Sequence, residues 1–121
     1  MPRAVGNVQY HHRHKAVLGI TKGHRATKHS LFRRAHESML KSLSYSYRHR
    51  RERKGDMRKL WIARINALSR ANGMTYGQFI SGLKAAGVGL NRKTLADMAV
   101  REPAAFANLV TLAKGQTQTQ G

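Results

Sequence analysis

The apolar positions of the chain are irregular in its first part and regular in its second part. From residue 1 to about residue 27, isolated apolar residues stand among Gly, His and cationic residues, and no helical stripe persists. This pattern predicts an extended or irregular basic arm. Residues 28–72 contain no Pro and a single Gly, so they can form one helix of about 45 residues.

The two ends of this long helix differ in their apolar faces. Up to residue 56, apolar side chains spaced by four residues form a line that is too thin to hold a core. The last part has a broader stripe at three- and four-residue spacing, formed by Met57, Leu60, Trp61, Ile65 and Leu68. We therefore expect residues 28–56 to form an exposed helix and residues 57–114 to form a C-terminal helical domain that includes the end of the long helix.

Capping signals divide the rest of the chain into three more helices. Thr75 and Gln78 have the spacing of a capping box, Asn91 can cap the next helix, and Pro103 can begin the last one. The expected fold class is all-α, with an extended basic N-terminal arm, a long basic helix and a small C-terminal helical bundle. The polar residues 115–121 predict a disordered tail.

The charge of the chain indicates what kind of partner it binds. There are 23 Lys and Arg against 5 Asp and Glu, which gives a formal net charge of +18. Eighteen of these cations and three of the acids lie in residues 1–70. This imbalance predicts a polyanionic partner that the first half of the chain contacts. The chain has no Cys, which excludes disulfide scaffolds and thiolate zinc sites.

Signals for membranes and secretion are missing from the sequence. The apolar runs are too short to span a membrane, and the N-terminus has no apolar region of the kind found in secretory signals. We therefore expect a soluble protein without a membrane partner. The N-terminus is rich in Arg and His and free of acids until Glu37, so a mitochondrial transit peptide is an alternative interpretation of this segment.

Groups suited to catalysis or metal binding are few. Among the five acids only Glu52 and Asp56 are helix neighbours, and surrounding cations are expected to pair with both. No Gly-rich phosphate loop is present. The cluster from His11 to His14 suggests a metal site, but neighbouring cations repel a metal ion and no carboxylate completes the ligand set. We expect no enzyme activity, no cofactor and no metal, with these His side chains facing phosphate or solvent.

The densest basic segment runs from Tyr45 to Lys54 and continues in three further cations, Arg58, Lys59 and Arg64. Projected at about 100° per residue, its cations nearly encircle the helix axis. A helix in one DNA groove, or flat on an anionic membrane, needs cations mainly on one side, whereas a helix embedded in folded RNA meets phosphates on several sides. Repulsion among these charges destabilises the free helix, so part of it should order only with the anion. Tyr45 can stack on bases, whereas Trp61 is expected to anchor the core.

Six segments together carry a specific family pattern. They are Arg13-His14-Lys15, Lys22-Gly23, Tyr45-Ser46-Tyr47-Arg48, and the runs from Arg58 to Asn66, from Phe79 to Lys84 and from Arg92 to Asp97. In this order and spacing they resemble the bacterial and organellar large-subunit ribosomal protein L-twenty (L20) family, from Pro2 to about Leu112. The resemblance implies an arm and a long helix threaded into large-subunit ribosomal RNA, a C-terminal helical domain at an RNA junction, and no catalysis.

The resemblance also implies which side chains contact RNA. These are Arg3, Arg13, Lys15, Lys22, Arg25, Arg48, Arg50, Arg51, Arg53, Lys54, Arg58, Arg64, Arg92 and Lys93. His14, as a phosphate-facing ring, and Tyr45, as a stacking ring, complete the predicted RNA-binding set. In this interpretation the arm and the long helix neutralise phosphates where RNA helices converge, and the C-terminal domain recognises shape and fixes the register.

The expected function is that of a structural constituent of the large ribosomal subunit, which binds large-subunit ribosomal RNA directly and promotes early subunit assembly. Its partners would be that RNA, neighbouring large-subunit ribosomal proteins and, as in some family members, its own messenger RNA. The expected location is the cytoplasmic ribosome, with an organellar ribosome as the alternative. The alternative function is that of a DNA-compacting architectural protein, which would also be small, basic and free of Cys.

Overall fold

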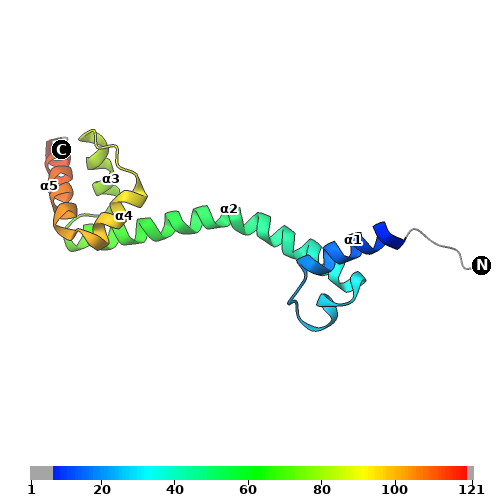
Figure 1. Ribbon diagram of the computed structural model, residues 1–121. Helices are drawn as coiled ribbons and strands as arrows, with labels where there is room; N and C mark the ends of the chain where they lie inside the picture. The colour runs from blue at the N-terminus through cyan, green and yellow to red at the C-terminus, as the bar shows by residue number, and fades with distance from the viewer. Residues whose placement is uncertain (1–6, 120–121) are drawn as a thin grey trace, which may run out of the picture. The chain divides into compact units, whose positions relative to one another are not determined.

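The computed structural model describes residues 7–119, which form helices and no strand (Figure 1). In chain order the elements are α1 (Asn7–Ile20), the 3₁₀ helix η1 (Ala26–His29), α2 (Phe32–Ala71), α3 (Tyr76–Ala85), α4 (Arg92–Arg101) and α5 (Pro103–Thr119). The predicted all-α class is confirmed. Contacts divide the chain into a first unit, Met1–Arg51, and a second unit, Glu52–Gly121, and α2 contributes residues to both.

In the first unit, α1 lies beside the beginning of α2 (Figure 1). Aromatic rings join the two helices. The His14 ring stacks on Phe32 with ring centroids 3.5 Å apart and planes 4° apart. The Tyr10 ring in turn lies against the His14 ring, and the centroids of these two rings are 4.0 Å apart. Beneath the rings, Thr21 and Ala35 are fully buried. This small contact orders the N-terminal segment.

The prediction of an extended arm is wrong for residues 7–20, which form α1. The helix has no buried residue, so the sequence carries no apolar stripe to reveal it. It is held instead by the ring contact between His14 and Phe32, two residues far apart in the sequence. Gly23 follows with a φ of +87°, a conformation in which Gly is favoured and which lets the chain turn after α1.

The predicted long helix is confirmed as α2, a helix of 40 residues. Its end lies one residue before the predicted Asn72, and its beginning lies four residues after the predicted Lys28. The later start arises because residues 26–29 form the 3₁₀ helix η1. The helix continues through Gly55, where an added Cβ would meet open space.

In the second unit, α3, α4 and α5 gather around the C-terminal end of α2 (Figure 1). They enclose one apolar core, in which Ile65, Phe79, Leu95, Phe106 and Val110 are the largest fully buried apolar side chains. The rings of Phe79 and Phe106 lie 4.9 Å apart between centroids. Helices α3 and α5 come closest at Gly82, where a Cβ atom would lie 2.6 Å from the carbonyl oxygen of Ala113. Trp61 packs against this core as predicted.

The predicted caps are present in the second unit. The Thr75 hydroxyl accepts from the Gln78 backbone N–H, and the Gln78 side chain accepts from the Thr75 backbone N–H. Asn91 Oδ1 accepts from the backbone N–H of Thr94 at 2.8 Å, and α5 begins at Pro103. Local signals therefore fix the beginnings of all three short helices.

The prediction of a disordered tail is wrong for residues 115–119, because α5 continues to Thr119. A Gly inside a helix costs only about 1 kcal/mol, so Gly115 does not end a helix that is anchored in a core. The hydroxyl of Thr117 also donates to the carbonyl of Ala113 at 2.8 Å, which satisfies that polar side chain within the helix. Residues 120 and 121 of the predicted tail lie outside the described residues.

Lys114 joins α5 to the end of α2. Its ammonium Nζ donates to the backbone carbonyl oxygen of Asn72 at 2.6 Å, across 42 residues of sequence. The carbonyl end of a helix carries partial negative charge, so a cation is favourable there. This contact closes the second unit around the C-terminal end of α2.

Candidate RNA interface

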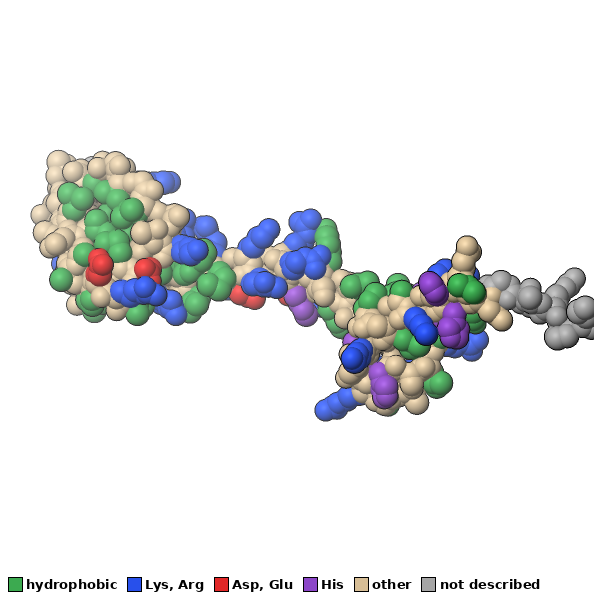
Figure 2. Space-filling model, in the orientation of Figure 1, with side chains coloured by type: hydrophobic (Ala, Val, Ile, Leu, Met, Phe, Trp, Pro, Cys, Tyr) green, Lys and Arg blue, Asp and Glu red, His purple; other side chains and the backbone are tan. Residues whose placement is uncertain are grey.

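The middle of α2 is exposed on every side. From Leu43 to Leu60 no residue is even half-buried, and Figure 2 shows lysine and arginine side chains projecting from this part of the helix. In the first unit this stretch carries Arg48, Arg50 and Arg51, and in the second unit it carries Arg53, Lys54, Arg58 and Lys59. At about 100° per residue, the four cations of the second unit already point in widely different directions. A cationic surface of this kind suits phosphates arriving from several sides.

Tyrosine rings order some of these cations. The ammonium of Lys41 and the guanidinium of Arg48 each lie 5.2 Å from the centroid of the Tyr45 ring. The guanidinium of Arg51 lies 4.8 Å from the ring of Tyr47. Cation–π contacts of this length are worth about 0.5–1 kcal/mol at exposed sites. Tyr45, predicted to stack on bases, therefore also positions cations.

In the second unit, side chains from α2 and from the beginning of α4 line one groove. We call it the α2–α4 groove. One part, of about 340 Å³, is lined by Lys54, Arg58, Trp61, Asn91, Arg92 and Lys93. An adjoining part, of about 600 Å³, shares Trp61, Asn91 and Lys93 and adds Arg64, Thr94, Ala96 and Asp97. The groove places Arg58 and Arg64 beside Arg92 and Lys93, predicted RNA-binding residues that lie about thirty positions further along the sequence.

Hydrogen bonds hold the α4 side of this groove in place. The Nε of Arg92 donates to the Tyr76 hydroxyl oxygen at 2.7 Å, so this half-buried guanidinium is attached to α3. Asn91 caps α4 by accepting from the backbone N–H of Thr94, which fixes the first turn that carries Arg92. A guanidinium fixed in this way loses less side-chain entropy when it binds a phosphate.

Removing the Tyr76 hydroxyl tests this positioning. In Tyr76→Phe the ring still packs against the core, but Arg92 loses its hydrogen bond, which is worth about 0.5–1.5 kcal/mol. We expect affinity for a large-subunit ribosomal RNA fragment to fall by about two- to tenfold. Filter binding measures the affinity, and thermal unfolding serves as the control for the fold. Unchanged affinity would show that Arg92 needs no support from Tyr76.

The other predicted RNA-binding residues lie in the first unit. Arg13, Lys15, Lys22 and Arg25 are exposed there, on α1 and the loop that follows it. His14 differs, because its half-buried ring packs against Phe32 instead of standing free for RNA. Arg3 lies outside the described residues.

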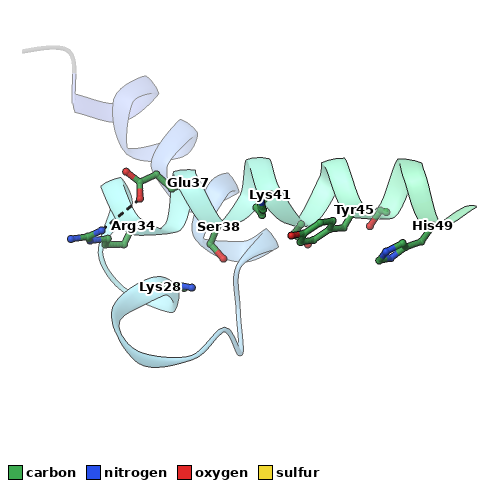
Figure 3. Close-up of a pocket in the computed structure, with 9 residues that line it drawn as sticks. Lys28, Arg34, Glu37, Ser38, Lys41, Tyr45 and His49 are labelled. Atoms are coloured by element: carbon green, nitrogen blue, oxygen red, sulfur yellow. Dashed lines mark ion pairs between the residues drawn. The ribbon is translucent and has the colours of Figure 1, made fainter.

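A second groove in the first unit includes residues that the sequence did not indicate (Figure 3). Its lining contains Tyr45, which was predicted to bind RNA, together with Lys28 and Lys41, which were not. The only signal for it in the sequence is the four-residue spacing that places Lys41, Tyr45 and His49 along one side of a helix.

One carboxylate lines each of the two grooves, and each is paired with a neighbouring arginine. Glu37 pairs with Arg34 at 3.7 Å, and Asp97 pairs with Arg101 at 3.0 Å. Both of these cations lie outside the predicted RNA-binding set. Among residues 7–119, His, Asp and Glu nowhere form a group of three or more that could hold a metal ion. No helix within the same range is long and apolar enough to cross a membrane.

Comparison with known proteins identifies the family. The family model described as Ribosomal protein L20 matches residues 3–109. The chain belongs to the ribosomal protein L20 family. Among the most similar relatives, large ribosomal subunit protein bL20 of Dehalococcoides mccartyi is 62% identical over 107 residues, covering 88% of this chain and 90% of the relative. The bL20 proteins of Moorella thermoacetica and Brevibacillus brevis are 55% and 50% identical, and each alignment covers at least 94% of both chains. The family that the sequence motifs resembled is thus confirmed.

Proposed function

We propose that this chain is a structural constituent of the large ribosomal subunit that binds large-subunit ribosomal RNA directly and promotes early assembly. The observation that carries the proposal is the α2–α4 groove, where cations from two helices converge beside an exposed basic helix. Guanidinium groups bind phosphates in forked geometry, and an RNA junction presents phosphates from more than one strand. The L20 family is structural and not enzymatic.

The mechanism is neutralisation of converging phosphates. RNA helices that meet at a junction repel one another, and a helix with cations on several sides lowers that repulsion when it lies between them. The same cations repel one another along α2 in the free protein, so binding RNA also stabilises the helix. The C-terminal bundle gives the complex a fixed register, because the α2–α4 groove holds its cations on a packed core.

The partners that this function requires are large-subunit ribosomal RNA and neighbouring large-subunit ribosomal proteins, and the location is the cytoplasmic ribosome. The chain's own messenger RNA stays a prediction, which competition between that RNA and the ribosomal fragment would test. A DNA-compacting protein, which is the alternative function, would not bind RNA in preference to duplex DNA.

Salt dependence tests the proposal. The logarithm of the affinity for a large-subunit ribosomal RNA fragment should fall by about 0.7–0.9 per logarithmic unit of salt for each phosphate neutralised. Titrations at several salt concentrations measure this slope, and competition with duplex DNA at fixed salt measures the preference. A slope near zero, or equal competition by DNA, would contradict the proposal.

A further inference from the structure

The groove in the first unit combines cations, hydroxyls and rings along α2 (Figure 3). We call it the serine groove. It has a volume of about 590 Å³ and is lined by Lys28, Arg34, Glu37, Ser38, Lys41, Ser42, Tyr45, Ser46 and His49. Figure 3 shows Lys28, Ser38, Tyr45 and His49 on the same side of the α2 ribbon. All of these residues belong to the first unit, so the groove is complete within it.

Two hydroxyls in this groove are available for a ligand. Within the part of the chain that the structure describes, those of Ser42 and Ser46 make no hydrogen bond, whereas the hydroxyl of Thr117 bonds back to its own helix. Ser38 differs from them, because its Oγ lies 2.6 Å from His24 Nδ1. Four residues of helix separate Ser42 from Ser46, so the two hydroxyls lie about 6 Å apart along the axis.

The charges of the groove favour an anionic ligand. Lys28 and Lys41 are exposed cations, and they come from η1 and α2 respectively. The single carboxylate in the lining, that of Glu37, is paired with Arg34. The parallel rings of Tyr45 and His49, 5.7 Å apart and tilted by 3°, form one wall. Lys41 lies over the ring of Tyr45, which limits its range of positions.

We propose that the serine groove binds the minor groove of A-form RNA, with the hydroxyls of Ser42 and Ser46 pairing with ribose 2′-hydroxyls. The minor groove of A-form RNA is wide and shallow and displays 2′-hydroxyls, so a helix face with short polar side chains can approach it closely. Each serine hydroxyl can donate and accept, as the 2′-hydroxyl can. Lys28 and Lys41 meet the flanking phosphates. The inference rests on the proposed function and adds to it a physical source for preferring RNA over DNA.

The test measures the preference and not the affinity alone. The probes are an RNA duplex and the DNA duplex of the same sequence, at fixed salt, with the full chain. In the double variant Ser42→Ala and Ser46→Ala, the ratio of RNA to DNA affinity should fall on the order of tenfold, because two hydrogen bonds to 2′-hydroxyls are lost. The salt slope should stay unchanged, since no phosphate contact is removed.

The chain offers a matched control in Ser44. It is an exposed serine of α2 between the other two, and about 200° of helix rotation separates it from each of them. Ser44→Ala should leave the ratio at the wild-type value, and circular dichroism should show the same helix content in all variants. A double variant with the wild-type ratio would overturn the inference while leaving RNA binding intact. Loss of RNA binding by the wild-type chain itself would instead overturn the proposed function.

Discussion

Replacing Arg58 and Arg64 together with Gln is expected to lower affinity for a large-subunit ribosomal RNA fragment on the order of a hundredfold. Both guanidinium groups line the α2–α4 groove, and both face positions where phosphates can also reach Arg92 or Lys93. Two lost phosphate contacts should also reduce the salt slope by about 1.4–1.8. Binding titrations at several salt concentrations measure both quantities.

A variant of equal charge separates the groove from net charge. Arg70 and Lys84 are exposed cations of the same unit that do not line the α2–α4 groove. Changing both to Gln removes the same two charges, so long-range attraction to RNA falls equally. We expect this control to retain most of the affinity. If the two double variants lose the same affinity, the groove has no special role.

Gly82→Ala is expected to destabilise the second unit by about 1–3 kcal/mol. The new Cβ would lie 2.6 Å from the carbonyl oxygen, 2.8 Å from the Cβ and 2.9 Å from the Cα of Ala113. Backbone atoms of α5 cannot rotate away as a flexible side chain can, so α3 and α5 must separate. The midpoint of thermal unfolding, followed by circular dichroism, should fall by roughly 5–20 °C.

Gly77→Ala on the same helix is the matched control. An added Cβ at Gly77 meets nothing within 4 Å, so the change raises helix propensity without a clash. We expect it to raise stability by up to about 1 kcal/mol. Equal stability of Gly82→Ala and the wild type would mean that α3 and α5 adjust without cost, and the close packing at Ala113 would then not limit the fold.

The sequence predicted those parts of the fold that depend on neighbouring residues. Thr75 with Gln78, Asn91 and Pro103 mark helix beginnings through local hydrogen bonds and backbone restriction, so the second unit could be divided correctly. The apolar stripe around Ile65 likewise indicated the docking end of α2, because a stripe reports burial on one side.

What the sequence missed depends on contacts between distant residues. Helix α1 is held by the stacking of His14 on Phe32, which no periodicity of either segment reveals. The α2–α4 groove is a similar case: the family resemblance indicated Arg58 and Arg92 separately, but only the fold of the second unit brings them into the lining of one groove. The serine groove needs Lys28 from η1, whose position depends on the turn before α2.

The contribution of α5 to the core has a consequence during protein synthesis. The chain leaves the ribosome from its N-terminus, and domains generally fold as units. Phe106, Val110 and Ala113 complete the core, and Lys114 closes it at Asn72, so the second unit cannot fold before the chain has emerged as far as these residues. A nascent chain therefore carries its positive charge well before it has the packed surface that arranges this charge. Shielding of the basic segment by a chaperone or by RNA itself would keep it from binding indiscriminately until α5 has emerged.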